Sequence, residues 1–133
     1  MERIKVRYCS RTKAGNTRRI AESIAEGAGV TAISIDDEPK LIGKTDILFL
    51  GGAPYANIMA PELRKYAESI EPETVGRIVL FTTSNWSRRT VHALRKIFNE
   101  KNIPVADKFF YAHMLNIDGK LEAAVRFGRE NCN

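Results

Sequence analysis

Short runs of apolar and β-branched residues recur from one end of the chain to the other, and they predict strands. Residues 4–8 alternate apolar and charged side chains, which is the pattern of a half-buried strand. Residues 46–50 and 78–81 are nearly continuous apolar runs, typical of strands covered on both faces of a sheet. Residues 30–35 and 105–112 complete the set of predicted strands, and the polar segment between residues 36 and 45 predicts a loop.

The stretches between these strands carry apolar residues at helical spacing. Residues 15–28 predict the first helix, which Gly29 ends because glycine adopts the left-handed conformation that terminates helices. Pro61 suits the first turn of the second helix. The inward-facing positions of the three later helices are predicted to be Leu63, Tyr66, Ala67 and Ile70, then Val91, Leu94, Ile97 and Phe98, and finally Leu121, Ala124, Val125 and Gly128.

The regular alternation of strand and helix predicts the fold class. It indicates an α/β protein with a doubly wound, five-stranded parallel sheet and helices on both faces, joined by right-handed crossovers. No repeat or linker divides the 133 residues, so residues 1–133 are expected to form a single domain. Ligands of such sheets bind beyond the carboxyl ends of the strands. The segments after the first, third and fourth strands are therefore the candidates for chemistry.

Charge narrows the classes of partner. The net charge is +5 and the isoelectric point is near 9.4, but the basic pairs are spread over separate elements and interleaved with acids. This distribution lacks the clustered basic surface of nucleic-acid-binding proteins and favours an anionic small ligand or an acidic protein partner. The pairs are Arg18-Arg19, Arg64-Lys65, Arg88-Arg89 and Arg95-Lys96.

No membrane or secretion signal is expected. The longest apolar runs, such as residues 47–50, fall far short of the roughly 20 residues of a membrane helix. The first residues alternate charged and apolar side chains without an apolar signal core, so the expected location is the cytoplasm. Cys9 and Cys132 form no C-x-x-C motif, and Cys9 is predicted to be a small buried residue at the end of the first strand.

The segment after the first strand is rich in hydrogen-bonding groups. Hydroxyls at Ser10, Thr12 and Thr17, the amide of Asn16 and the flexible Gly15 lie directly at the start of the first helix. A helix N-terminus carries unpaired N–H groups and partial positive charge, which suits a phosphate. An ordinary helix cap by Ser10, Thr12 or Asn16 would need only one of these residues. The surplus favours anion binding.

This segment also resembles a known family motif. Residues 8–12, Tyr-Cys-Ser-Arg-Thr, followed by Gly-Asn-Thr at 15–17, resemble the flavodoxin phosphate loop Y-x-S-x-T-G-N-T. The resemblance implies that the loop binds the 5′-phosphate of FMN. Lys13 and Ala14 are a two-residue insertion relative to that motif. The residues implied to hold the phosphate are Ser10, Thr12, Gly15, Asn16 and Thr17.

The segment after the third strand contains an aromatic residue and resembles a second flavodoxin loop. Gly51-Gly52 are predicted to end the strand. The following Ala53-Pro54-Tyr55-Ala56 resembles the flavodoxin loop that lays an aromatic ring on the isoalloxazine, which implies this role for Tyr55 and flavin contacts for Ala53, Pro54 and Ala56. Ala56 stands where many flavodoxins have glycine. The alternative for Tyr55 is a half-buried loop aromatic.

The segment after the fourth strand matches the third flavin-contacting loop of that family. Trp86 is implied to flank the flavin, and Thr82, Thr83 and Ser84 to offer main-chain N–H groups to its carbonyl edge. The alternative is that Trp86 caps the following helix. Arg88-Arg89 make this rim basic, where flavodoxins are usually acidic. His92 is predicted to face solvent and His113 to lie in the loop after the last strand.

Three functions follow, in order of preference. The first is an FMN-binding electron carrier that serves an acidic redox partner protein. The second is a flavin-free module that uses the fold as a binding surface. The third is a small NAD(P)H-dependent FMN reductase or quinone reductase. A response-regulator receiver is excluded, because the acids and the lysine that it needs at the strand ends are missing.

Overall fold

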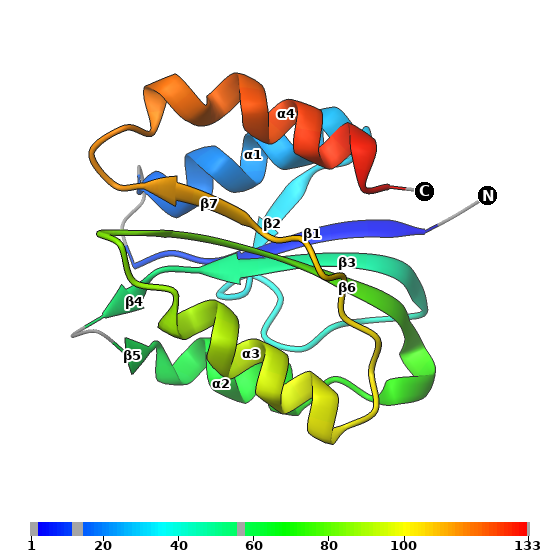
Figure 1. The fold of residues 1–133 in the computed structure, drawn as a ribbon. Coiled ribbons are helices and arrows are strands. Elements are labelled where there is room, and N and C mark those ends of the chain that lie inside the picture. The colour runs from blue at the N-terminus through cyan, green and yellow to red at the C-terminus, as the bar shows by residue number, and fades with distance from the viewer. Residues whose placement is uncertain (1–2, 12–14, 56–57, 133) are drawn as a thin grey trace.

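The parallel sheet has the strand order β2-β1-β3-β6-β7 (Figure 1). This computed structural model describes residues 3–11, 15–55 and 58–132. The chain passes from β1 to β2 on one side and then returns to place β3 on the other side of β1, so strand order reverses beside β1. The strands are β1 (Ile4–Cys9), β2 (Ala32–Ser34), β3 (Thr45–Gly52), β6 (Val75–Ser84) and β7 (Phe110–His113).

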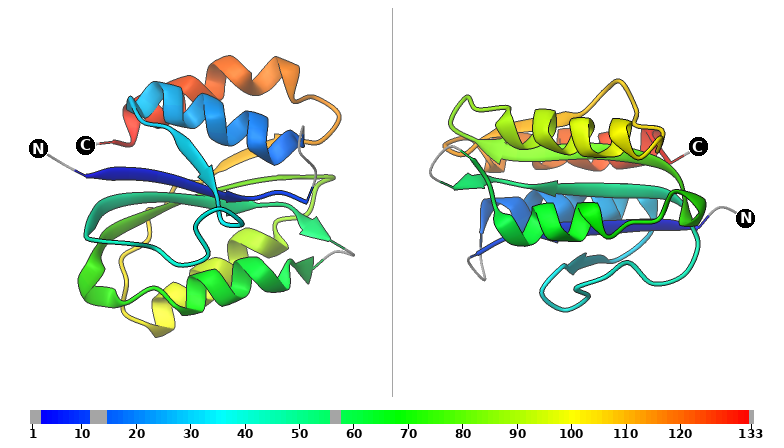
Figure 2. Two further views of the ribbon diagram at one scale, coloured as in Figure 1. Left: turned by 180° about the vertical axis from the view of Figure 1, so that it is seen from behind. Right: turned by 90° about the horizontal axis from the view of Figure 1, so that it is seen from below.

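Helices cover both faces of this sheet, as Figures 1 and 2 show. Helices α1 (Asn16–Ala28) and α4 (Leu121–Glu130) lie on one face, and α2 (Pro61–Glu68) and α3 (Arg89–Glu100) lie on the other. Two short 3₁₀ helices, η1 (Pro72–Thr74) and η2 (Asp118–Lys120), lead into β6 and α4. The predicted doubly wound α/β class is confirmed. Within the described ranges, none of the helices combines the length and the apolar character needed to cross a membrane.

Side chains along the central strand β3 point alternately to the two faces of the sheet, and the core is accordingly divided into two apolar clusters. Phe49 of β3 points into the cluster under α1 and α4, whereas Leu48 and Leu50 point into the cluster under α2 and α3. All three side chains are fully buried, as expected for a strand covered on both faces. Gly29 ends α1 with a φ of 77°, so the predicted helix stop is confirmed.

Two strands extend further than predicted. Gly51 and Gly52, predicted to halt the strand after residue 50, belong to β3 as its last two residues and pair with β1 and β6. A side chain at Gly51 would place a Cβ 2.2 Å from the Phe81 carbonyl oxygen, so the glycine permits a close approach within the sheet and does not break the strand. Thr83 and Ser84, predicted in a loop, pair with β7 as the end of β6.

Two edge strands are shorter than predicted. The strand predicted over residues 30–35 is formed only by β2. The run 105–112 contributes an isolated bridge at Val105 and then β7, which begins at Phe110 and includes His113. Asp107 and Lys108 lie between these pieces, and polar residues of this kind are disfavoured in strands.

A short antiparallel hairpin follows β3 and was not predicted. It consists of β4 (Pro54–Tyr55) and β5 (Ile58–Met59), with Tyr55 opposite Ile58. Pro54 is compatible with the edge of so small a sheet because it donates no hydrogen bond. The hairpin places Tyr55 beyond the carboxyl end of β3.

Candidate functional site

A cavity of about 450 Å³ opens at the carboxyl edge of the sheet, where β1, β3 and β6 end. Most of the residues predicted to contact a ligand line it, although they come from three separate segments. These are Ser10, Gly15, Asn16, Thr17, Ala53, Pro54, Tyr55, Thr83 and Ser84. The predicted contacts Thr12 and Ala56 lie outside the described residues, as do Lys13 and Ala14 of the insertion.

The N-terminus of α1 forms one wall of the cavity. Gly15 occupies the N-cap position in extended conformation, and no side chain among the described residues caps the helix there. Its first turn holds Arg18 and Arg19 and no acid, so the helix dipole is not compensated by the protein. The amide of Asn16 donates instead to the Met114 carbonyl at 3.3 Å. The main-chain N–H groups that open α1 are therefore suited to an anion.

Buried hydroxyls form the floor of the cavity and join its strands to α1. The Oγ1 atoms of Thr17 and Thr83 are 2.7 Å apart, and both residues are almost fully buried. The Thr82 hydroxyl donates to the Gly52 carbonyl oxygen at 2.7 Å, and the Ser84 hydroxyl donates to the carbonyl oxygen of Ser87. The Thr17–Thr83 and Ser84–Ser87 bonds join residues that line the cavity, and the Thr82–Gly52 bond ties β6 to β3 next to it.

Tyr55 forms a second wall, and Arg11 holds it in place. The main-chain N–H of Arg11 donates to the Tyr55 hydroxyl at 3.0 Å, and the Arg11 guanidinium lies 4.1 Å from the centre of the ring. Arg11 also forms an ion pair with Glu62 of α2 at 3.2 Å, and this hydrogen bond lowers the pKa of Glu62. Partial burial raises the pKa of Tyr55, so the ring is neutral at physiological pH.

Trp86 does not line this cavity. Its side chain is 75% exposed, and its ring packs edge-on against the His113 ring with 4.6 Å between the centroids. The backbone of Trp86 has a φ of 71°, and its N–H donates to the Tyr111 hydroxyl at 2.7 Å. This strained turn directs the side chain to solvent, so the structure does not bring Trp86 to the predicted position.

Residues missed by the sequence analysis complete the lining beside Ser84. They are Asn85, Ser87 and Met114. Asn85 and Ser87 flank Trp86 in the segment already considered, whereas Met114 follows the last strand, which carried no motif. His113 is the final residue of β7 and not a loop residue; its Nε2 is 2.9 Å from Asn85 Oδ1. His92 is exposed on α3, as predicted.

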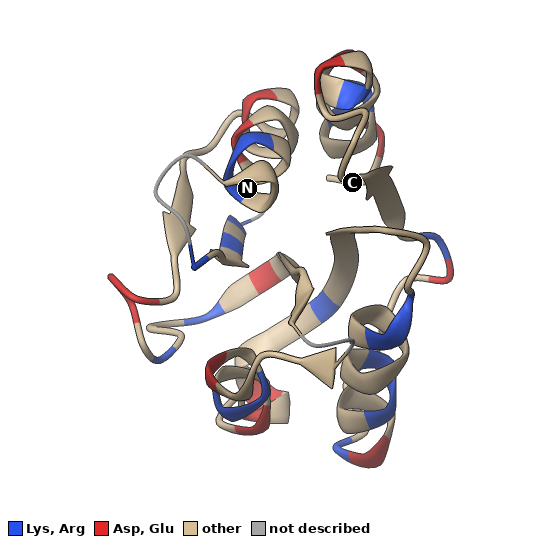
Figure 3. Cartoon of the chain, turned by 90° about the vertical axis from the view of Figure 1, so that its left-hand side faces the viewer, with Lys and Arg blue, Asp and Glu red and all other residues tan. Residues whose placement is uncertain are grey.

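Charges of both signs are interleaved along the helices (Figure 3). Arg88 and Arg89 are exposed and directly follow the segment that carries Asn85 and Ser87. Over the described parts of the chain, no group of histidine, cysteine, aspartate or glutamate side chains could hold a metal ion. The site is therefore built from hydroxyls, amides, main-chain N–H groups and one aromatic ring.

This set of groups fits a phosphate-bearing flavin. The uncapped start of α1 offers N–H donors to a dianion, and Tyr55 with Ala53 and Pro54 offers an aromatic and apolar wall to a planar ring. The volume of the cavity lies within the range of small-molecule sites. Thr83 and Ser84 line the same cavity and offer polar groups to the polar atoms of such a ring.

Comparison with known proteins supports the fold. No protein-family model matches the sequence, and no curated protein matches it significantly. Among solved structures, an archaeal flavodoxin superposes with a TM-score of 0.78 at 19% identity, covering 98% of this chain and 96% of that one. A WrbA-like flavodoxin from Agrobacterium tumefaciens gives a TM-score of 0.78 at 20% identity, covering 100% and 96%.

An NADH:FMN oxidoreductase, solved in its apo form, is also similar, with a TM-score of 0.69 at 11% identity and coverage of 100% and 91%. Identities this low establish a shared backbone arrangement and no more. The strand order, the helices on both faces and these superpositions agree with one another. The chain therefore has the flavodoxin-like fold.

Proposed function

We propose that this protein binds FMN in the cavity at the end of β1, β3 and β6 and serves as an electron carrier. The observation that carries the proposal is the uncapped, acid-free N-terminus of α1 facing a cavity that also contains Tyr55. Bound FMN would supply the redox chemistry, because flavins accept and donate electrons. The protein contributes binding, orientation and electrostatics.

Each wall of the cavity has its own role in this proposal. Gly15, Asn16 and Thr17 bind the phosphate through the first turn of α1, with Ser10 beside them. Tyr55 packs on the flavin ring, and the Arg11 guanidinium on the Tyr55 ring keeps that wall rigid. Thr83 and Ser84 present main-chain N–H groups to the polar edge of the ring.

The partner we propose is an acidic redox protein. Exposed apolar side chains at Trp86, Met114 and Leu115 lie on the loops around the cavity, and exposed Arg88 and Arg89 accompany them. A patch of this composition suits a transient interface, in which apolar contact gives affinity and complementary charge steers association. It also gives the exposed Trp86 a role outside the flavin site.

An acid at the start of α1 tests the phosphate site and removes only the exposed hydrogen bond from Asn16 to the Met114 carbonyl. Asn16→Asp is nearly isosteric and favours the helix N-terminus, so the fold should persist. A carboxylate there would repel the phosphate dianion of FMN but not riboflavin, which has no phosphate. We expect FMN to bind at least about tenfold more weakly, a loss of about 1.4 kcal/mol, with riboflavin affinity unchanged.

Asn99→Asp, at an exposed position near the end of α3, is the matched control and should leave both affinities unchanged. Equal weakening of FMN and riboflavin by Asn16→Asp would contradict the proposed phosphate site. Failure of the wild-type protein to bind either flavin would favour the flavin-free binding module. Oxidation of NADPH by the FMN-loaded protein alone would favour the reductase.

A further inference from the structure

The positive charge of the chain is concentrated in and around α3. Residues 88–108 contain six lysines and arginines against two acids, and so hold four of the five net positive charges. Two of the four basic pairs seen in the sequence, Arg88-Arg89 and Arg95-Lys96, belong to this helix and its N-cap. Figure 3 shows basic residues on successive turns of α3, at the lower right of the view.

These basic residues share one side of the helix. At 3.6 residues per turn, the positions 88, 92, 95 and 99 follow one line along α3, and 89 and 96 follow the adjacent line. The opposite side of α3 is buried against the sheet. A hollow of about 380 Å³ lies on the outer side. We call this side the basic face; its members are Arg88, Arg89, His92, Arg95, Lys96 and Asn99.

The cations of the basic face have no counter-charge in the protein. Within the described ranges, no acid lies in ion-pair contact with any of them. The Arg88 guanidinium lies 5.2 Å from the centre of the Tyr111 ring, and Arg95 donates to the main-chain carbonyl of Asp107 at 3.4 Å. Both contacts are with neutral groups. A row of uncompensated cations repels itself and is stabilised by acids from outside the chain.

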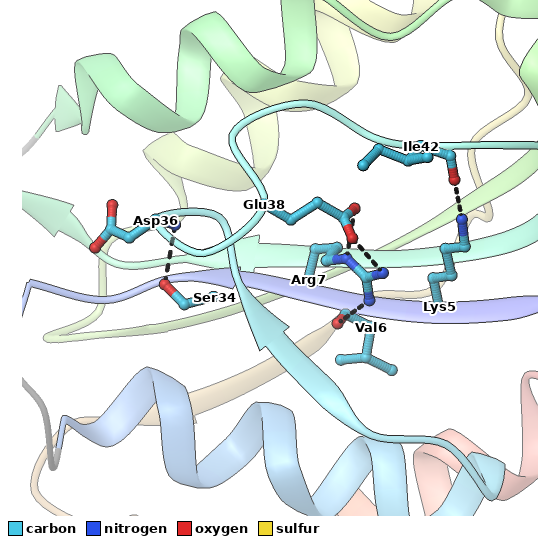
Figure 4. Close-up of polar contacts among 7 residues, drawn as sticks. All are labelled: Lys5, Val6, Arg7, Ser34, Asp36, Glu38 and Ile42. Atoms are coloured by element: carbon cyan, nitrogen blue, oxygen red, sulfur yellow. Dashed lines mark hydrogen bonds and ion pairs between the residues drawn. The ribbon is translucent and has the colours of Figure 1, made fainter.

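Several cations elsewhere in the chain are engaged by the protein itself. The nearly buried Arg7 guanidinium donates to the Glu38 carboxylate at 2.9 and 3.0 Å, and Lys5 donates to the Ile42 carbonyl oxygen (Figure 4). Three further arginines each form an ion pair with an acid, namely Arg11, Arg18 and Arg19. The open charge of the basic face is therefore not shared by every cation of the chain.

The basic face begins beside the proposed flavin cavity. Ser87, which lines the cavity, directly precedes Arg88, and the exposed Trp86 comes just before them. From there α3 runs back along the sheet, away from the carboxyl ends of the strands (Figure 1). A partner bound along α3 would therefore lie next to the cavity and could also contact Trp86.

An acidic protein fits this face better than other anionic partners do. Glu100 and Asp107 are exposed acids near the far end of α3, and they repel the continuous charge of a nucleic-acid backbone. A protein surface can place neutral or basic groups opposite them. Along α3, which the structure describes throughout, no large apolar side chain is exposed that could enter a lipid layer.

We propose that the basic face of α3 is the docking surface for an acidic protein, whose carboxylates pair with the uncompensated cations of the helix. Complementary charge steers such a partner and orients it beside the cavity. The redox role of this partner rests on the proposed function, whereas the docking surface itself does not.

The test is a titration with a glutamate–alanine peptide of the same length as α3, at low ionic strength, with and without FMN on the protein. Trp86 is the single tryptophan of the chain and lies next to the basic face, so its fluorescence reports binding. We expect saturable binding that weakens at least about tenfold at physiological salt, because exposed charges are screened. A lysine–alanine peptide of the same length should not bind.

Arg89→Glu/Lys96→Glu reverses two exposed cations of the basic face and should weaken binding of the acidic peptide at least about tenfold. The matched control, Arg64→Glu/Lys65→Glu on α2, makes the same change in net charge at exposed positions and should stay within about twofold of wild type. Arg89→Gln/Lys96→Gln, which adds no acid, should give a smaller loss. FMN affinity should be unchanged in all three variants, because none of these residues lines the cavity.

Three results would each overturn the inference. The first is the absence of saturable peptide binding by the wild-type protein at low ionic strength. The second is equal weakening by the α2 and α3 charge reversals, which would make binding a consequence of net charge alone. The third is tighter binding, through the same cations, of single-stranded DNA or phosphatidylserine vesicles, which would assign the face to nucleic acid or to a membrane. Failure to bind FMN would contradict the proposed function and leave the peptide result unchanged.

Discussion

Arg11 and Tyr55 are joined by a hydrogen bond from the Arg11 N–H to the Tyr55 hydroxyl at 3.0 Å. The same arginine lays its guanidinium on the ring, 4.1 Å from the ring centre, and pairs with Glu62 of α2. Arg11 thereby connects the segment after β1 to the hairpin after β3 by two contacts and to α2 by a third. These contacts hold the Tyr55 wall of the cavity in place before a ligand binds.

Replacing Tyr55 by alanine should weaken FMN binding by about tenfold, since stacking on an aromatic ring contributes about 1 kcal/mol and buried area contributes further. Tyr55→Phe keeps the ring and loses only the bond from Arg11, so it should stay within about threefold of wild type. Quenching of flavin fluorescence measures both affinities. An unchanged affinity in the alanine variant would remove Tyr55 from the site.

Thr17→Val should lower the free energy of unfolding by about 1–3 kcal/mol, because the buried Thr83 hydroxyl loses its partner at 2.7 Å. Thr90 is a matched control. Its buried hydroxyl has no hydrogen-bond partner in the part of the chain described, so Thr90→Val should be neutral or stabilising. Urea unfolding compares the two, and equal losses would show that the Thr17–Thr83 bond contributes nothing specific.

Glu38→Gln should destabilise the protein by about 3 kcal/mol, because it leaves the nearly buried Arg7 guanidinium without a counter-charge. Asp118 pairs with Arg19 on the surface and is 85% exposed, so Asp118→Asn should cost less than about 1 kcal/mol. Thermal or urea unfolding of both variants gives the comparison. Similar small losses in both would mean that the Arg7–Glu38 pair is effectively solvated.

Cys9 should resist alkylation in the folded protein. Burial raises the pKa of Cys9 to about 12, so almost no thiolate forms at pH 8, whereas Cys132 is only partly buried. Iodoacetamide followed by mass spectrometry should place the label on Cys132 alone, with Cys9 modified only after denaturation. Comparable labelling of both thiols under native conditions would indicate that β1 opens readily.

The sequence was sufficient for the features that depend on local pattern. Continuous apolar runs identified the buried strands β3 and β6, and helical spacing identified α1, α2, α3 and α4. Gly51 was misjudged because its role depends on Phe81 in a neighbouring strand, which is a tertiary contact invisible to local turn rules. The broken strand after Val105 shows the same limit at a sheet edge.

The candidate site was likewise predictable where it depends on local pattern and not where it depends on tertiary contacts. Residues in the segments that follow the central strands, such as Thr17 and Tyr55, line one cavity as predicted, because parallel strands bring their carboxyl ends to one edge. Trp86 does not, because a left-handed backbone conformation and the Tyr111 hydroxyl turn it away from the cavity. Met114 was missed, since it reaches the site only through the packing of β7 beside β6.

The central claim is that the start of α1 holds a dianion. Its most direct test is a pair of titrations of the wild-type protein, one with FMN and one with riboflavin, each monitored by the quenching of flavin fluorescence. The structure predicts saturation with a single FMN per chain and riboflavin binding at least about tenfold weaker, because charge-assisted hydrogen bonds to the phosphate are lost. Absence of FMN binding at high micromolar concentration, or equal affinity for the two flavins, would contradict it.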